Sequence, residues 1–196
     1  MSTLSRRKRA YHHGDLRSSI LRAAAELLEK QGIEALSVRA AARRAEVSHN
    51  APYRHFPGKA ALLAALAADG FARFGAELAA AERAGGLRAR GEAYVRFALA
   101  NPQHFCLMFS AGLKISGDAD LREQAGRAFG GLEQAISAHS GQEAPYAAIA
   151  AWALVHGLSH LLLDQKLARA SREGVQQFVR SVLGAVRFTV PSQRPA

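Results

Sequence analysis

The sequence contains little cysteine and few residues that favour β-strands. Cys106 is the one cysteine among 196 residues, which excludes an internal disulfide framework and a zinc site built from several thiolates. Threonine occurs only at Thr3 and Thr189, and no stretch shows sustained alternation of polar and apolar residues. Alanine, leucine, arginine and glutamate dominate instead, so we predict an all-α protein.

Acidic residues are scarce relative to basic ones. The chain has 26 Lys and Arg against 16 Asp and Glu, a formal charge of +10. Residues 1–60 hold 12 of the basic and 5 of the acidic residues, whereas residues 61–196 hold 14 and 11. This distribution predicts a small polyanion-binding head on a larger helical body. The predicted segments are a flexible basic arm (1–13), the head (14–60), the helical body (61–190) and a tail (191–196).

Signatures of enzymes, secreted proteins and membrane proteins are also missing. We find no Gly-x-Ser-x-Gly elbow, no phosphate-binding glycine loop and no paired-carboxylate signature, so we expect neither an enzyme nor a cofactor. No apolar segment of a signal peptide follows the basic run from Arg6 to Arg9. The stretch from Ala144 to Leu163 is uncharged and long enough to span a bilayer, but its histidines favour a helix inside a protein bundle. We therefore expect a cytoplasmic protein.

Capping residues, glycines and prolines mark the predicted helix ends. Gly32 suits the left-handed position that stops a helix, and Ser37 can cap the next one. The pair Gly85-Gly86 closes a long helix, and Asn101-Pro102 combines a capping side chain with a proline at the first helical position. The predicted helices are 16–31 after Asp15, 38–45, 49–56 after Ser48, 59–84, one starting at Pro102, one from Asp120 (paired with Glu123) to about Ala138, one from Pro145 to Leu167, and one from Ser171 to Phe188.

Residues 37–56 have the dimensions of a helix-turn-helix, in which the second helix reads base edges in the major groove. Arg54 can pair with guanine and Asn50 with adenine, whereas aromatic and basic neighbours suit phosphates. By spacing alone, a helical hairpin with a solvated basic face remains an alternative. We expect His49, Asn50, Ala51 and Arg54 at base edges and Tyr53, His55 and Lys59 at phosphates.

The stretches from Tyr11 to Arg17 and from Val47 to Lys59 resemble the DNA-binding head of the TetR family of bacterial transcriptional repressors. The resemblance implies a homodimer that binds a palindromic operator. One position departs from the family pattern, because Glu46 stands where glycine is common, and a positive φ there would cost roughly 1 kcal/mol. The DNA-binding residues that follow are Arg39, Ser48, His49, Asn50, Ala51, Tyr53, Arg54, His55 and Lys59.

The body resembles a regulatory subtype named for a Trp-His-Gly signature, and the residues that carry this likeness include Asn101-Pro102 and the run from Trp152 to Gly157. This resemblance implies a dimer interface made by the helices from Pro145 to Leu167 and from Ser171 to Phe188. It also implies a small-molecule pocket. For each candidate residue, the alternative is a side chain that packs in the core and contacts no ligand. The pocket candidates are Phe105, Met108, Phe109, Trp152 and His156.

Two further interpretations concern single side chains. His156, His160 and Asp164 share one helical stripe; hydrogen-bonded interface histidines are the favoured interpretation over a metal site, so we predict no metal. Cys106 is expected to be a small buried apolar side chain.

The function implied is a repressor that a small-molecule effector releases from its operator by moving the helix from Lys59 to Ala84. A transcriptional activator and a DNA-binding protein without an effector are the alternatives.

Overall fold

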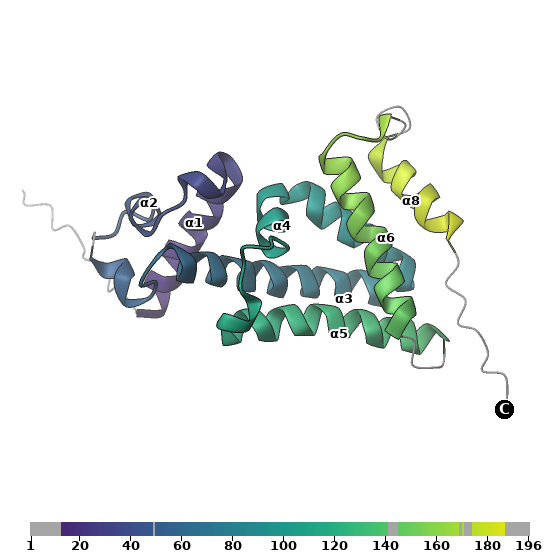
Figure 1. Cartoon of the computed structure of the whole chain (residues 1–196), viewed down its shortest axis with the longest axis horizontal. Coiled ribbons are helices and arrows are strands. Elements are labelled where there is room, and N and C mark those ends of the chain that lie inside the picture. Colours follow the sequence, from purple (N-terminus) through teal and green to yellow (C-terminus); the bar gives the residue numbers. More distant parts are fainter. Residues whose placement is uncertain (1–12, 49, 141–144, 169, 171–173, 187–196) are drawn as a thin grey trace, which may run out of the picture. The chain divides into compact units, whose positions relative to one another are not determined.

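The structure, a computed structural model, describes residues 13–48, 50–140, 145–168, 170 and 174–186 (Figure 1). Its regular elements in this part of the chain are all helices, which confirms the predicted all-α class. The chain forms two compact units, Met1–Leu66 and Ala67–Ala196, called the head and the body below. The division falls at Leu66, whereas the sequence predicts a boundary at residue 60. Most of the predicted arm and all of the predicted tail lie outside the described residues.

The head consists of α1 (His13–Ala35), α2 (Val38–Arg44), the 3₁₀ turn η1 (Ala51–Arg54) and the first residues of α3 (Lys59–Ala100). These elements bury one small core, because each contributes apolar side chains to the same interior. The side chains almost completely buried there are Ile20, Ala24, Leu28, Leu36, Ala41, Phe56 and Leu62.

Two of the predicted boundary signals in the head are confirmed. Gly32 interrupts α1 with φ 76°, although the helix begins at His13 and resumes as far as Ala35. Ser37 caps α2, since its Oγ accepts a hydrogen bond from the Ala40 amide at 3.1 Å.

The turn that follows α2 satisfies the last carbonyls of that helix. The Val47 amide donates to Ala42 O at 3.1 Å and the Glu46 amide donates to Arg43 O at 3.2 Å, the bonding pattern of a Schellman motif. The motif requires a left-handed conformation at the first of these two donors, and Glu46 adopts it with φ 56°. The strain anticipated for this non-glycine residue is therefore present.

Replacing Glu46 by glycine is expected to stabilise the head by about 0.5–1 kcal/mol, because glycine adopts positive φ without a steric clash. Glycine also raises the conformational entropy of the unfolded chain, which offsets only part of this stabilisation. Glu46→Ala is the matched control, since it removes the same charge and keeps the strain. Urea unfolding followed by circular dichroism measures both variants. Equal stabilisation by the two would show that the charge, and not the backbone, is responsible.

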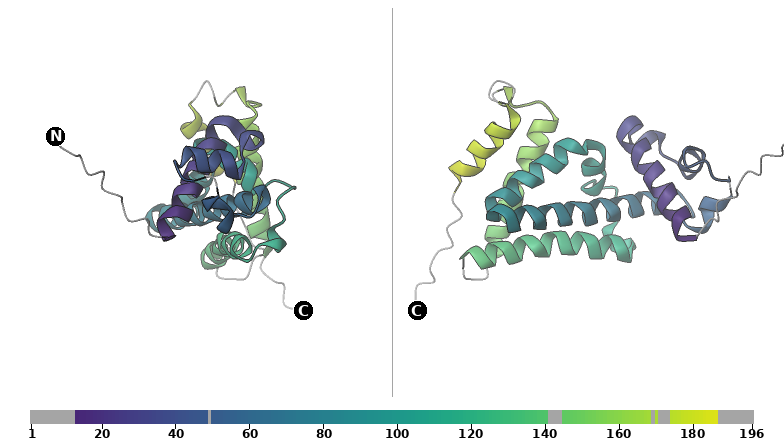
Figure 2. Two further views of the ribbon diagram at one scale, coloured as in Figure 1. Left: turned by 90° about the vertical axis from the view of Figure 1, so that its left-hand side faces the viewer. Right: turned by 180° about the vertical axis from the view of Figure 1, so that it is seen from behind.

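The body contains the rest of α3 together with α4 (Pro102–Met108), the 3₁₀ turn η2 (Ile115–Gly117), α5 (Ala119–Ser140), α6 (Pro145–Leu163) and α8 (Val175–Ala185). In the body, α5 runs alongside α3 and α6 crosses their far ends (Figures 1 and 2). The predicted glycine break is present inside α3, where Gly85 has φ −153° and Gly86 has φ 69°. The helical ladder is therefore interrupted, and the segment 87–100 continues beyond the break.

One predicted helix start is confirmed and another is shifted, and in both the capping bond differs from the prediction. Pro102 is the first residue of α4, yet Asn101 makes no capping bond to it, and its Nδ2 donates to Phe97 O at 3.0 Å instead. The cap of α5 is Asp118, whose Oδ1 accepts from the Leu121 amide at 2.9 Å. The prediction that Asp120 and Glu123 open this helix is wrong, because the helix already begins at Ala119 and Asp118 caps it.

The predicted ends of the last two helices also need correction. α6 begins at Pro145 as expected but stops at Leu163, because Gln165 adopts φ 55° and the Lys166 amide turns back to Leu161 O at 2.9 Å. α8 begins at Val175, after Gly174 with φ 81°, and ends at Ala185. The predicted start at Ser171 and end at Phe188 lie outside the described residues.

Cys106 is exposed and not buried as predicted. α4 is only two turns long, and the side chains of His104, Phe105, Leu107 and Met108 fill its inward face. Cys106 lies between them on the opposite face, so its helical position decides its exposure.

Candidate functional site

The predicted second helix of the helix-turn-helix is shorter than expected. Asn50 precedes η1, without a side-chain capping bond, and the turn spans Ala51–Arg54, so the predicted helix from residue 49 to residue 56 with Ser48 as its cap is wrong. Pro52 accounts for this because it has no amide to bond to the preceding turn. Its carbonyl accepts from the amides of both His55 and Phe56 at 2.9 Å, which closes the turn.

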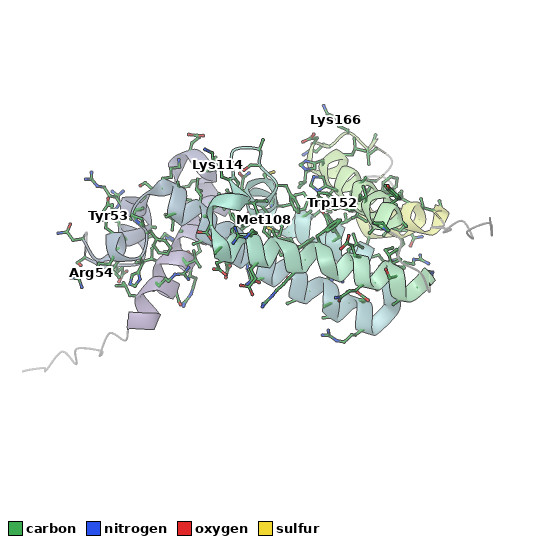
Figure 3. The ribbon with its side chains drawn as sticks, turned by 60° about the horizontal axis from the view of Figure 1, so that its bottom comes forward. Tyr53, Arg54, Met108, Lys114, Trp152 and Lys166 are labelled. Atoms are coloured by element: carbon green, nitrogen blue, oxygen red, sulfur yellow. The ribbon has the colours of Figure 1, made fainter. Side chains whose placement is uncertain are left out.

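Most of the residues predicted to contact DNA lie on the surface of the head. Tyr53 is 39% exposed, and Figure 3 shows Tyr53 and Arg54 pointing away from the helices. Ala51 and His55 are half-buried, and His49 lies outside the described residues. The exposed members of the set are Arg39, Ser48, Asn50, Tyr53, Arg54 and Lys59.

Sequence reasoning missed two contacts between the elements of the head. Arg44 at the end of α2 forms an ion pair with Glu26 of α1, with Nε donating to Oε2 at 3.0 Å. This hydrogen bond and the guanidinium charge lower the pKa of Glu26. The Arg17 guanidinium lies 5.6 Å from the centre of the Phe56 ring, a cation–π distance. Both pairs join residues far apart in the sequence, so no local spacing reveals them.

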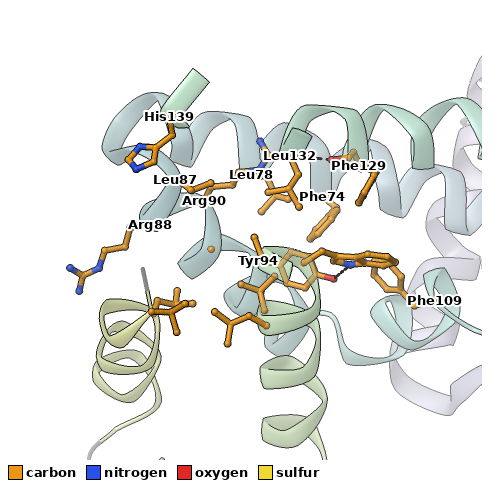
Figure 4. A pocket seen from close by; sticks show the side chains of 18 of the residues that line it. Phe74, Leu78, Leu87, Arg88, Arg90, Tyr94, Phe109, Phe129, Leu132 and His139 are labelled. Carbon is orange, nitrogen blue, oxygen red and sulfur yellow. Dashed lines mark hydrogen bonds between the residues drawn. The ribbon is translucent and has the colours of Figure 1, made fainter. Parts of the chain in front are cut away.

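The body contains a partly open cavity of about 730 Å³, within the size range of small-molecule sites. Helices α3, α5, α6 and α8 supply most of its wall. Figure 4 shows Phe109 and Phe129 toward one end of the lining residues, and Arg88 and His139 toward the other. Its aromatic lining residues are Phe71, Phe74, Tyr94, Phe109, Phe129 and Trp152.

Of the predicted pocket residues, Phe109 and Trp152 line this cavity. Phe105 and Met108 are 0% and 1% exposed and pack in the core behind it. His156 is half-buried and does not line the cavity, although its ring lies 4.7 Å from that of Phe109 between centroids.

A polar relay connects His156 to the cavity wall. Trp152 Nε1 donates to Tyr94 Oη at 3.1 Å, and Tyr94 Oη lies 2.9 Å from His156 Nδ1. Burial lowers the pKa of His156 and the neighbouring His160 lowers it further, which favours the neutral ring, whose Nδ1 can accept a hydrogen bond from the Tyr94 hydroxyl. Burial also raises the pKa of Tyr94, so the hydroxyl stays protonated and the relay stays intact.

Sequence reasoning missed Tyr94 and Arg90 as members of this site. Tyr94 is an aromatic residue in a helix rich in apolar residues, and its hydrogen-bond partners lie 58 and 62 positions away. Arg90 is a charged residue but only 5% exposed. Neither position carries a local signal.

The two histidines of the α6 stripe, His156 and His160, lie in contact with each other. The rings of His156 and His160 pack edge to face at 4.7 Å between centroids. No group of three His, Cys, Asp or Glu side chains among the described residues could hold an ion.

Two family models match the chain in the order of its two units. Residues 20–66 match the model described as bacterial regulatory proteins of the TetR family. Residues 87–186, half of the chain, match the tetracycline repressor-like C-terminal domain. The chain belongs to the TetR family. It is therefore a transcriptional regulator with an N-terminal helix-turn-helix DNA-binding domain, and the Trp-His-Gly subtype stays a prediction.

Solved structures agree with this assignment. A protein of unknown function from Rhodococcus sp. RHA1 is 34% identical, with a TM-score of 0.72 over 91% of this chain and 94% of that one. The TetR family regulator PfmR from Thermus thermophilus is 21% identical, with a TM-score of 0.60 over 84% and 94%. The multidrug binding protein EbrR, complexed with imidazole, is 23% identical, with a TM-score of 0.60 over 91% and 98%. The latter two show the shared fold. No curated protein matches the chain.

α6 is long and apolar enough to cross a membrane by length and composition alone. In this TetR-family regulator it is a helix of the body and not a membrane span. Inside it, Ser159 Oγ donates to Val155 O at 2.7 Å, which satisfies a buried hydroxyl. Only 28% of its apolar stretch is buried within one chain.

Proposed function

We propose that this regulator is a cytoplasmic homodimeric repressor that binds a palindromic operator and is released by a small-molecule effector held in the body. The proposed release by an effector is supported by the aromatic-lined cavity of about 730 Å³ in the body. The other unit of the protein is a DNA-binding head.

DNA reading is assigned to the exposed surface around η1. Arg54 and Asn50 contact base edges, and His49 and Ala51 complete that set. Tyr53 and Lys59 contact phosphates. Two observations support this assignment. The charged side chains of Arg54 and Lys59 are exposed. The side chains of Pro52 and Phe56 are buried and anchor the turn beneath them. The residues that flank this surface are Arg39, Ser48 and His55.

The dimer interface is assigned to α6 and α8. Large apolar side chains that stay exposed in one chain mark surfaces that a partner covers. Of the seven such residues in the described chain, three lie on α6, one on α8 and one directly after α8. They are Tyr146, Ile149, Leu161, Val175 and Val186.

Effector binding is assigned to the cavity, with Phe109 and Trp152 in its wall. EbrR, a neighbour with the same fold, is described as a multidrug binding protein and holds imidazole, which supports a ligand role for this body. Phe105, Met108 and His156 pack behind the wall and respond to its occupant. An effector releases DNA only if it binds the non-operator conformation more tightly. We assign that change to the helix from Lys59 to Ala84.

Transcription in vitro tests the proposal. A promoter overlapped by the bound DNA site is expected to yield fewer transcripts as the protein is added, because an operator-bound dimer blocks polymerase. The same promoter with a scrambled site serves as the control and should be unaffected. A rise in transcripts would show an activator, and an equal fall on both templates would show binding without sequence preference.

A further inference from the structure

The charged groups in the cavity wall have one sign. Arg88 and Arg90 line it, and none of its lining residues, all of which belong to the described chain, is Asp or Glu. A cationic ligand would find no countercharge among the lining residues, whereas an anionic one would find the buried guanidinium group of Arg90 in an apolar surrounding, where a charge-assisted hydrogen bond is strong.

The side chain of Arg90 is buried, and two hydrogen bonds fix its position. Its side chain is 6% exposed, Nη1 donates to Glu82 Oε2 at 2.7 Å, and Nη2 donates to Ala128 O at 3.3 Å. A guanidinium carries five N–H donors, so these two bonds leave donors for a ligand. Gly131 makes the room, since a Cβ there would lie 3.1 Å from Arg90 Nη2.

The bond to Glu82 spans the glycine break of α3. Glu82 belongs to the segment before Gly85 and Gly86, and Arg90 belongs to the segment after them. Glu82 is itself one-third exposed and does not line the cavity. A negative group that binds Arg90 from the cavity therefore competes with Glu82 for the same guanidinium and weakens the ion pair across the break.

We propose that the effector is an amphipathic anion whose apolar part lies among the aromatic side chains and whose carboxylate, sulfate or phosphate group binds Arg90 in competition with Glu82. This rests on the proposed effector role of the cavity. The ion pair lies at the end of the segment that begins at Lys59, so the charge of the ligand acts on the helix to which the release of DNA is assigned.

Three probes with the same apolar chain and different head groups test the charge preference. They are dodecanoate, dodecan-1-ol and dodecyltrimethylammonium, titrated into the full-length protein below their micellar concentrations. Trp152 is the one tryptophan of the chain and lines the cavity, so its fluorescence reports occupancy directly. Dodecanoate is expected to bind about tenfold more tightly than either other probe, as a charged hydrogen bond in an apolar site implies.

Two variants with opposite expected effects test the competition. Arg90→Gln should remove the preference for dodecanoate over dodecan-1-ol, whereas Glu82→Gln should tighten dodecanoate binding. Arg83→Gln, an exposed residue of the same helix outside the cavity wall, is the matched control and should change nothing. Arg90→Lys keeps the positive charge but loses the planar, two-pronged guanidinium. It serves as a second variant if Arg90→Gln does not fold, and it should retain only part of the preference for dodecanoate.

The outcomes separate the two proposals. Equal binding of the three probes, or tighter binding of the cation, would overturn the anion assignment while leaving an effector cavity in place. Weaker dodecanoate binding by Glu82→Gln would overturn the competition across the break. If no probe changes Trp152 fluorescence, the cavity admits no such ligand, and both the anion assignment and the proposed effector role of the cavity fail.

Discussion

Replacing Phe105 by alanine is expected to lower the free energy of unfolding by about 3–5 kcal/mol, the range for a fully buried phenylalanine. Phe105 is 0% exposed. Its ring lies 4.9 Å from Phe109, 5.9 Å from Tyr94 and 5.4 Å from His156 between centroids. Removing the ring leaves a hole between α3, α4 and α6 that these neighbours cannot fill without leaving their own positions.

Phe129→Ala is the matched control for this experiment. Phe129 is half-buried, lines the cavity and contacts Trp152 at 5.6 Å between ring centroids. Because its ring already faces open space, its removal should cost clearly less than that of Phe105. Urea unfolding at one fixed protein concentration measures both, since the stability of the proposed dimer would depend on concentration. Equal losses would show that Phe105 is not part of a close-packed core.

Replacing Arg54 by alanine is expected to weaken operator binding by about 1–3 kcal/mol and to relax the sequence preference at one base pair. Lys59→Ala should weaken binding to all sequences alike, because phosphate contacts carry no sequence information. Arg127→Ala, which removes an exposed arginine paired with Glu123 on α5, is the charge-matched control and should leave binding unchanged.

Anisotropy titrations of the operator and of unrelated duplex DNA, at one salt concentration, distinguish these effects. An Arg54→Ala protein with an unchanged sequence preference would contradict the assignment of Arg54 to base reading. A Lys59→Ala protein that loses affinity for the operator alone would contradict a phosphate role.

The parts of the fold that could be predicted depend on residues with a local backbone preference. Gly32, the Gly85-Gly86 pair and Pro102 act through their own φ angles or missing amide, so their effects do not depend on distant neighbours. The left-handed position of Glu46 is also foreseeable, but from the family pattern and not from the residue itself. Gln165 takes the same conformation at the end of α6 without any such signal, which is why the sequence predicts a helix that runs on to Leu167.

The parts that could not be predicted depend on tertiary contacts. Two carboxylates near the start of α5, Asp118 and Asp120, are equally good caps by type, and only the path of the chain decides between them. The relay from Trp152 through Tyr94 to His156 and the bond between Arg90 and Glu82 join separate helical segments. Residue types alone indicate a pocket in the body, but its polar groups follow from packing.

The most direct test of the central claim is selection of bound DNA from a random pool by the full-length protein. We expect an inverted repeat whose half-sites lie about one helical turn apart, roughly 34–36 Å. The protein should also prefer this site over unrelated duplex by about 10³ or more. Recovery of single half-sites without symmetry, or of no preferred sequence at all, would contradict a dimeric, sequence-specific repressor.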